Sequence, residues 1–174
     1  MATWQEFADA VPEMAERGFH QLSIPVAYLA TVRKNGAPRL HPLSPMFADG
    51  CLFVAIQSTS PRRYDLARDG RYSLHALPPM LGPDYDEFEF NVTGRAELVT
   101  DAATRALVNA AENARGRPTL PEEGLFELHI EAALTSVWAH KMMQRGDMWI
   151  PELGPEPVKA TRRIWKERAD GHLG

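Results

Sequence analysis

Excess basic charge, cysteine pairs and long apolar runs are all missing from this chain of 174 residues. With a net charge of -4 and a pI of about 5.9, it has no basic field for a polyphosphate backbone, so nucleic acid is not an expected partner. A single cysteine, Cys51, excludes an intramolecular disulfide. No apolar run approaches the ~18 residues of a membrane span, and the N-terminus has no leader pattern. We therefore expect a cytoplasmic protein with no membrane association and a single domain, residues 1–174.

Motifs for metal binding and for common hydrolytic chemistry are also missing. The six histidines never stand at a spacing such as H-x-x-x-H, and no second cysteine could complete a metal site. Neither G-x-S-x-G nor G-x-x-x-x-G-K occurs, so the hydrolases and nucleotide triphosphatases that carry these motifs have no support. Cys51 lies in an apolar run and is expected to be a small buried hydrophobe. We expect no metal, and we name no general acid or base.

The first part of the chain has the pattern of a helix, from about residue 3 to 17. Apolar residues recur there at helical spacing after Thr3, which can form a capping box with Glu6 three residues later. Pro12 predicts a kink or two shorter helices, and Gly18 predicts the end of the last turn.

Two later segments are also expected to be helical. Asp101 can cap a helix from residue 102 to 112, whose apolar contribution is Leu107 and Val108. The basic C-terminal tail, residues 155–174, contains a helix-like piece from 158 to 168 with Ile164 and Trp165 as its large apolar residues.

Extended segments account for most of the remaining chain. Three prolines in the second segment cannot donate ladder hydrogen bonds, so this strand is expected to be bulged or at an edge, with backbone groups free for a ligand. In the last segment we expect one face to carry Phe126, Leu128, Ile130 and Ala132. Strands linked by hairpins, with a short helix between the third and fourth, predict a mainly β antiparallel barrel with flanking helices. The segments are residues 26–33, 37–47, 51–56, 71–77, 87–99 and 125–138.

The short helix, from Pro61 to about residue 68, begins with hydroxyl residues and two adjacent arginines. Ser60 can cap it, and Pro61 suits its first position, where no N–H is needed. The remaining free amides, at Arg62 and Arg63, lie at the positive end of the helix dipole, and such an end binds phosphate. Adjacent residues on a helix project about 100° apart, so one of the two arginines should dominate.

A solvated surface helix, in which Asp65 and Arg68 pair at helical spacing, explains the same residues without a ligand. The surrounding sequence favours the phosphate interpretation. It contains T-V-R-K-N-G-A-P-R-L-H-P-L from Thr31, then C-L-F-V-A-I, then S-x-R-x-x-D-L-x-x-D-x-R-x-S-L from Ser60, and N-V-T-G-R-A-E-L-V from Asn91. In this order and spacing, the four pieces resemble the pyridoxamine 5'-phosphate oxidase-like, FMN-binding split-barrel family.

The resemblance, strongest over residues 26–99, implies a six-stranded antiparallel split barrel that works as a homodimer with flavin at the subunit interface. It implies that Arg62 and its neighbours hold the cofactor phosphate, while the strand around His41 lies against the isoalloxazine ring, where His41 could donate to a flavin carbonyl. Trp138 either reaches across from the partner subunit or is an ordinary core tryptophan. The candidate cofactor-binding residues are His41, Leu43, Ser44, Ala55, Thr59, Ser60, Arg62, Arg63 and Trp138.

These expectations point to an FMN-dependent oxidoreductase that acts on a small-molecule substrate, with the protein positioning the ring for hydride transfer. Related members bind F420 or haem. An F420H2-dependent reductase therefore stays open, with Arg33, Lys34, Arg39 or the basic tail as extra contacts, and so does a flavin or haem carrier without turnover. The late R-x-H cluster with which the oxidase itself grips its substrate phosphate has no counterpart after Trp138, so oxidation of pyridoxine phosphate is not expected.

Overall fold

Strands outnumber helices, as the sequence pattern predicts. The computed structural model describes residues 1–24, 26–77, 87–138, 142–151 and 160–167. Four helices lie in this part of the chain: α1 (Trp4–Ala10), α2 (Pro12–Leu22), α3 (Pro61–Asp69) and α4 (Ala102–Ala114). The strands are β1 (Ala27–Val32), β2 (Pro38–Leu43), β3 (Met46–Ala48), β4 (Cys51–Ile56), β5 (Arg71–Ala76), β6 (Glu87–Leu98), β7 (Gly124–Trp138), β8 (Met142–Arg145), β9 (Met148–Pro151) and β10 (Ala160–Lys166).

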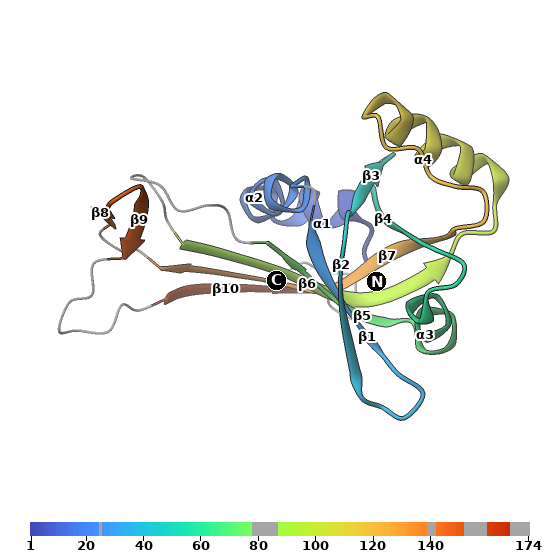
Figure 1. Cartoon of the computed structure of the whole chain (residues 1–174), viewed down its shortest axis with the longest axis horizontal. Coiled ribbons are helices and arrows are strands. Elements are labelled where there is room, and N and C mark those ends of the chain that lie inside the picture. Colours follow the sequence, from blue (N-terminus) through green and yellow to red (C-terminus); the bar gives the residue numbers. More distant parts are fainter. Residues whose placement is uncertain (25, 78–86, 139–141, 152–159, 168–174) are drawn as a thin grey trace.

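The sheet is curled into a barrel by its own connectivity. Its strand order is β2-β1-β5-β6-β7-β4-β3, with β10 also paired to β7, so β2 and β3 are its two edges. Laid flat, seven strands spaced ~4.8 Å apart would separate these edges by about 29 Å. The three peptide steps from Leu43 to Met46 span at most ~11 Å, so the sheet must bend until its edges approach (Figure 1). The predicted mainly β antiparallel barrel is confirmed. Its predicted number of six strands is not, because β10 adds a strand to the sheet even when β2 and β3 are counted as one interrupted strand.

Most of the features predicted for the N-terminal helical segment are confirmed by α1 and α2. The Glu6 amide donates to Thr3 Oγ1 at 3.2 Å and the Thr3 amide donates to Glu6 Oε2 at 2.7 Å, which is the expected capping box. Pro12 starts the second of two helices. The predicted end at Gly18 is wrong, because α2 continues to Leu22. A Cβ on Gly18 would lie 2.3 Å from Cζ of Phe90, so this glycine allows the helix to pack on β6.

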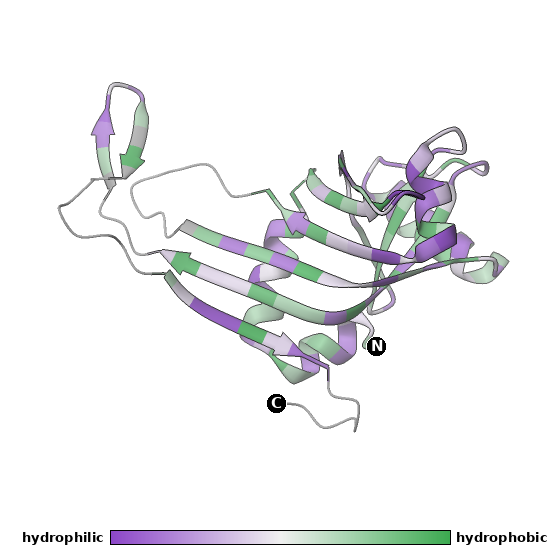
Figure 2. Cartoon of the chain, turned by 90° about the horizontal axis from the view of Figure 1, so that it is seen from below, coloured by the Kyte–Doolittle hydropathy of each residue, from purple (hydrophilic) through white to green (hydrophobic). Residues whose placement is uncertain are grey.

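Both helices lie against one face of the sheet (Figure 1), and the main hydrophobic core fills the space between them. Side chains alternate in polarity along the long strands, which Figure 2 shows as alternating green and purple. The core joins Phe7 of α1, Leu22 of α2 and Phe90 of β6, none of which is exposed. No helix in the described part of the chain is long and apolar enough to cross a membrane.

One β-bulge determines which side chains of β7 face the core. Thr93 of β6 pairs with Ala132, but Gly94 pairs with Ile130, so Glu131 is an extra residue on β7. A Cβ on Gly94 would lie 1.9 Å from the His129 carbonyl oxygen, so this close approach requires glycine.

The bulge corrects the predicted inward face of β7. The expected residues before it, Phe126, Leu128 and Ile130, are buried, but Ala132 is not among the buried residues. Beyond the bulge the alternation shifts by one, so Ala133 and Thr135 are buried instead, at 1% and 4% exposure. Period-two patterns break at a bulge, because one strand gains a residue that its partner lacks.

The helix predicted at residues 158–168 is wrong over 160–166, and residues 158, 159 and 168 lie outside the described part of the chain. Residues 160–166 form β10, which pairs antiparallel with β7. Trp165 is 2% exposed and its ring lies 5.1 Å from that of Phe7, whereas Ile164 is 61% exposed. A strand sends neighbouring side chains to opposite faces, and here it satisfies backbone groups along an edge of β7 that a helix would leave free.

The predicted N-cap of α4 is confirmed, but only one of its two predicted apolar residues is buried. The Thr104 amide donates to Asp101 Oδ2 at 2.7 Å. Val108 is fully buried, but Leu107 is 42% exposed. The short hairpin β8–β9, which the sequence reading missed, pairs only with itself among the described strands and stands apart from the sheet (Figure 1).

Candidate functional site

The start of α3 is organised around the side chain of Arg62. Ser60 occupies the N-cap position, but its hydroxyl does not cap a backbone amide as predicted. Instead Arg62 Nε donates to Ser60 Oγ at 3.1 Å, and Arg62 Nη1 donates to the Pro42 carbonyl of β2 at 3.3 Å. The Arg63 amide is not free either, because it donates to the Ser60 carbonyl at 3.1 Å. Ser60 therefore orients the arginine rather than the helix.

Arg62 has no negative partner in the described part of the chain. Its side chain is half-buried, and both of its acceptors are neutral oxygens. Burial lowers the pKa of Arg62, and the charge of Arg39 lowers it further, but a guanidinium remains protonated at neutral pH. An uncompensated, partly desolvated cation is a site that favours an anion.

The neighbouring acid, Asp65, is fully used by other residues. Its carboxylate accepts from Arg39 Nε at 2.7 Å and from Thr31 Oγ1 at 3.2 Å, and Arg68 Nη1 lies 3.4 Å away. Burial raises the pKa of Asp65, yet these hydrogen bonds outweigh burial and the pKa lies below its ordinary value. The Asp65–Arg68 pair expected for a solvated helix is therefore present, but it leaves Arg62 outside the pairing.

His41 lies beside this basic cluster on β2. Burial lowers the pKa of His41, and the charges of Arg62, Arg39 and Arg33 lower it further, so its imidazole is neutral near pH 7. Exposure alternates along β2, and Arg39, His41 and Leu43 share its half-buried face. Strand β2 lies at an edge of the sheet, as its prolines predict.

The structure brings part of the predicted set together. Arg62 donates both to Ser60 Oγ and to the Pro42 carbonyl. Pro42 is flanked by His41 and Leu43 on β2, and Ser44 follows just after this strand. Ala55 lies on β4 and Thr59 follows this strand. Arg63 takes another direction, since its Nε lies 3.1 Å from where a Cβ on Gly124 would be. One arginine of the pair therefore contacts β2.

Trp138 does not join this group within one chain. It ends β7, whereas Gly124, next to Arg63, begins it. Strands rise ~3.3 Å per residue, so the two ends of β7 are roughly 40 Å apart. Contact between Trp138 and the cofactor stays a prediction that requires a second subunit.

Three cavities in the described part of the chain lie away from the Arg62 cluster. They have volumes of about 260, 170 and 130 Å³, and their linings include none of the nine predicted residues. The sequence reading missed the lining of the largest of the three, which includes Thr161 and Arg163 of β10. Thr161 and Arg163 stand four and two residues before Trp165, so on a strand they share the face of this buried tryptophan, and this spacing was the available signal.

Neither thiol chemistry at Cys51 nor metal binding finds support in the described residues. Burial raises the pKa of the Cys51 thiol to about 12, with further contributions from Glu127 and Asp49, so the thiolate is scarce at neutral pH. Among the described residues, no group of three or more histidine, cysteine or acidic side chains could hold a metal ion.

Comparison with known proteins places the chain among related folds. The family model described as pyridoxamine 5'-phosphate oxidase matches residues 15–136. HutZ, the heme storage protein from Vibrio cholerae, aligns with a TM-score of 0.55 and 20% identity over 70% of this chain and 90% of that one. General Stress Protein 26 from Bacillus anthracis aligns with a TM-score of 0.51 and 21% identity over 69% and 91%.

A heme binding protein from Mycobacterium smegmatis aligns with a TM-score of 0.54 and 18% identity, covering 92% of this chain and 58% of that one. At such identities these structures share the fold alone. None of the curated proteins matches the sequence.

Proposed function

The chain belongs to the pyridoxamine 5'-phosphate oxidase family, and from this premise we propose that it is an FMN-binding oxidoreductase in which Arg62 holds the cofactor phosphate. FMN, when bound, would supply hydride transfer. The observation that carries the proposal is the half-buried guanidinium of Arg62, which has no carboxylate partner among the described residues. A phosphate dianion would compensate this charge, and charge-assisted hydrogen bonds of this kind contribute about 1.5 to 3 kcal/mol.

The other residues of the cluster have supporting parts in this proposal. Ser60 accepts from Arg62 Nε and so orients the guanidinium. Asp65 pairs with Arg39, so its charge does not compensate Arg62, whose guanidinium can then face an anion. The neutral imidazole of His41 can donate one N–H to a carbonyl of the ring. Leu43 and Ala55 are half-buried apolar residues suited to contact with the ring.

Titration with FMN and with riboflavin, which lacks the phosphate, tests the assignment. Arg62→Ala should weaken FMN binding about 10- to 100-fold, the loss expected for a charge-assisted contact, and should leave riboflavin binding unchanged. The visible absorbance of the bound flavin and its fluorescence quenching report both affinities. Equal affinity of Arg62→Ala and the unmodified protein for FMN would refute the phosphate site.

Arg63→Ala is the matched control for charge. It removes the same charge from the adjacent position, but its side chain turns toward Gly124. We expect Arg63→Ala to bind FMN within about threefold of the unmodified protein, since distant surface charges are screened. If both variants lose affinity equally, net charge and not a specific contact attracts the cofactor.

The proposal includes a homodimer in which Trp138 of one subunit approaches the flavin of the other. It is supported by the separation of Trp138 from Arg62 along β7 and by the open setting of the cluster in a single chain. Sedimentation equilibrium should give about 39 kDa, twice the chain mass of 19.5 kDa. Trp138→Ala should then lower FMN affinity, and a monomer at micromolar concentration would contradict this part of the proposal.

Haem is a second candidate ligand, since two of the structural neighbours are named for heme storage and binding. The specific observation in its favour is His41, whose neutral imidazole could ligate iron while Arg62 faces a propionate. A haemin titration should then produce a Soret band that His41→Ala shifts or abolishes. F420 is the remaining alternative, and the same titration format with F420 in place of FMN tests it.

A further inference from the structure

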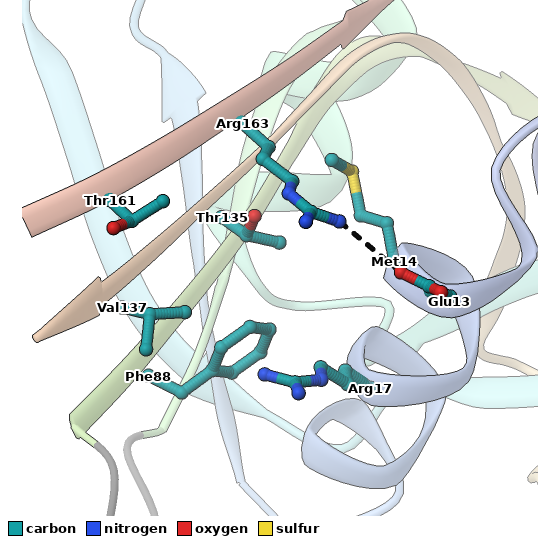
Figure 3. A pocket seen from close by; sticks show the side chains of 8 residues that line it. All are labelled: Glu13, Met14, Arg17, Phe88, Thr135, Val137, Thr161 and Arg163. Carbon is teal, nitrogen blue, oxygen red and sulfur yellow. Dashed lines mark hydrogen bonds and ion pairs between the residues drawn. The ribbon is translucent and has the colours of Figure 1, made fainter. Parts of the chain in front are cut away.

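A second site lies on the helix-covered face of the sheet, away from the Arg62 cluster. A cavity of about 260 Å³ opens between α2, β6, β7 and β10 (Figure 3). Its lining combines two arginines, Arg17 and Arg163, with the carboxylate of Glu13 and the buried residues Phe88 and Thr135. Within one chain, its lining includes none of the nine residues assigned to the flavin.

The apolar part of the cavity is built on an aromatic ring. Phe88 is 8% exposed, and the guanidinium carbon of Arg17 lies 5.5 Å from the centroid of its ring (Figure 3). Met14 and Val137 extend the apolar wall. Arg17 makes no ion pair with a described carboxylate, so its charge beside the ring stays available to a ligand.

Thr135 supplies an unused polar group to the same space. The residue is 4% exposed, and its hydroxyl makes no hydrogen bond with another described residue, although it is not among the fully enclosed polar atoms that lack a partner. Figure 3 shows the Thr135 side chain between Arg163 and Phe88, on the wall of the cavity. A hydroxyl on the wall of an open cavity can exchange water for an oxygen atom of a ligand.

The ion pair at the rim is weak enough to be exchanged. Arg163 Nη1 donates to Glu13 Oε2 at 3.2 Å, but the two side chains are 68% and 84% exposed. Exposed pairs of this kind contribute little to stability, so a ligand anion can replace Glu13 as the partner of Arg163. With two guanidiniums and one carboxylate, the lining carries net positive charge.

We propose that this cavity binds a small organic anion, a carboxylate or phosphate monoester on a compact aromatic body. The aromatic body would lie on Phe88, while the anionic group would reach Arg17, Arg163 and the Thr135 hydroxyl. The volume is slightly below the ~300 to 1,000 Å³ of sites for drug-sized ligands, which suits a molecule with a single ring.

Benzoate and phenyl phosphate are the probes for this site, with benzyl alcohol and benzylamine as neutral and cationic counterparts of the same size. Amide chemical-shift titration of the full chain measures the affinities and locates the contacts. We expect both anions to perturb residues of α2 and β10 in a saturable way, and the alcohol and amine to cause smaller shifts. No saturable shift at these residues with either anion overturns the proposal.

Three charge variants give a signed test. Arg17→Gln and Arg163→Gln should each weaken benzoate binding about tenfold, the loss of one charge-assisted contact. Glu13→Gln should strengthen it about threefold, because Arg163 loses its competing partner and the lining becomes more positive. Arg162→Gln is the matched control, since its side chain leaves the opposite face of β10, and it should bind benzoate as the unmodified chain does. Equal weakening by Arg162→Gln and Arg163→Gln overturns the site and leaves only a general charge effect.

Thr135→Val separates a ligand contact from a structural role. The substitution keeps the shape and removes a hydroxyl that has no described partner, so stability in urea should be unchanged or higher. Benzoate affinity should nevertheless fall about threefold, the loss of one hydrogen bond to a neutral donor. Unchanged benzoate affinity removes Thr135 from the site, and lost stability shows that the hydroxyl has a structural partner. The measurements involve no flavin, so they are independent of the proposed oxidoreductase function.

Discussion

Arginine–carboxylate pairs occur in both candidate regions, but they differ in burial. At the start of α3, Asp65 is 5% exposed and holds Arg39 at 2.7 Å, with Arg68 as a second partner. At the cavity below α2, Glu13 is 84% exposed and its distance to Arg163 is 3.2 Å. A buried carboxylate must keep its partners, because an unpaired buried charge is costly, whereas an exposed one can exchange them with water or a ligand.

This difference shows how each region can present positive charge to a ligand. Near α3, the buried acid satisfies Arg39 permanently and leaves Arg62 as the spare cation. In the cavity, no buried acid is present in the described lining, and Arg163 becomes available when its exposed partner leaves. The first region is a fixed electrostatic site and the second an adjustable one. Four measurements test this difference in burial.

The largest effect is expected at the bulge that turns Thr135 toward the cavity. In Gly94→Ala the new methyl group would lie 1.9 Å from the His129 carbonyl oxygen, so the bulge must rearrange. We expect a loss of at least about 3 kcal/mol in urea unfolding, as for severe overpacking. Gly36→Ala is the control, since nothing lies within 4 Å of that position and only its positive φ opposes alanine. Its cost should be about 1 kcal/mol, and a similar value for Gly94→Ala would contradict the close approach.

Removing the buried acid should have the next largest effect. Asp65→Asn deletes the charge that Arg39 and Arg68 share, and leaves these guanidiniums without compensation. Breaking a buried pair usually costs about 3 to 5 kcal/mol, and we expect about 2 to 3 kcal/mol here because Arg39 is partly exposed. Urea unfolding at pH 7 measures the loss. A change below 0.5 kcal/mol, on the order of a surface pair, would place both regions in the same class.

The pH dependence of stability tests whether the charge of Asp65 stabilises the fold. The pKa of Asp65 is below its ordinary value of 3.8 in the folded chain, so its ionised form stabilises the fold. That contribution is complete above the unfolded pKa and is lost as pH falls through the folded pKa. The stability difference between the unmodified chain and Asp65→Asn should therefore be constant from pH 7 to about 5 and shrink below about pH 4. A difference that stays constant down to pH 2.5 would show that the carboxylate charge is not the cause.

The smallest effect is expected at the exposed pair. Glu13→Gln should change the free energy of unfolding by less than about 0.5 kcal/mol, because solvent and salt screen a pair this exposed. The change should also vanish in 1 M salt, which urea unfolding at two ionic strengths can check. A loss as large as that of Asp65→Asn would mean that Glu13 has a structural role, and the adjustable character of the cavity would be wrong.

Sequence patterns predicted the framework well where the signal is local. The Thr3–Glu6 capping box, the division into two shorter helices at Pro12 and the Asp101 cap depend on residues within four positions of one another, and all three are confirmed. The barrel and the edge position of β2 are also confirmed. The nine cofactor residues stay a prediction, although the contact of Arg62 with the Pro42 carbonyl supports part of the set.

Sequence alone was sufficient for the six predicted extended segments, the Thr3–Glu6 capping box, the Asp101 cap and the position of a basic helix start after β4. These features follow from periodicity and from hydrogen bonds between near neighbours. Only the tertiary structure decided that residues 160–166 form a strand, that Thr135 faces the cavity and that Asp65 neutralises Arg39 instead of Arg62. Each of these depends on a partner more than twenty residues away in the chain. Local spacing does not specify which distant backbone edge or charge will be there to pair.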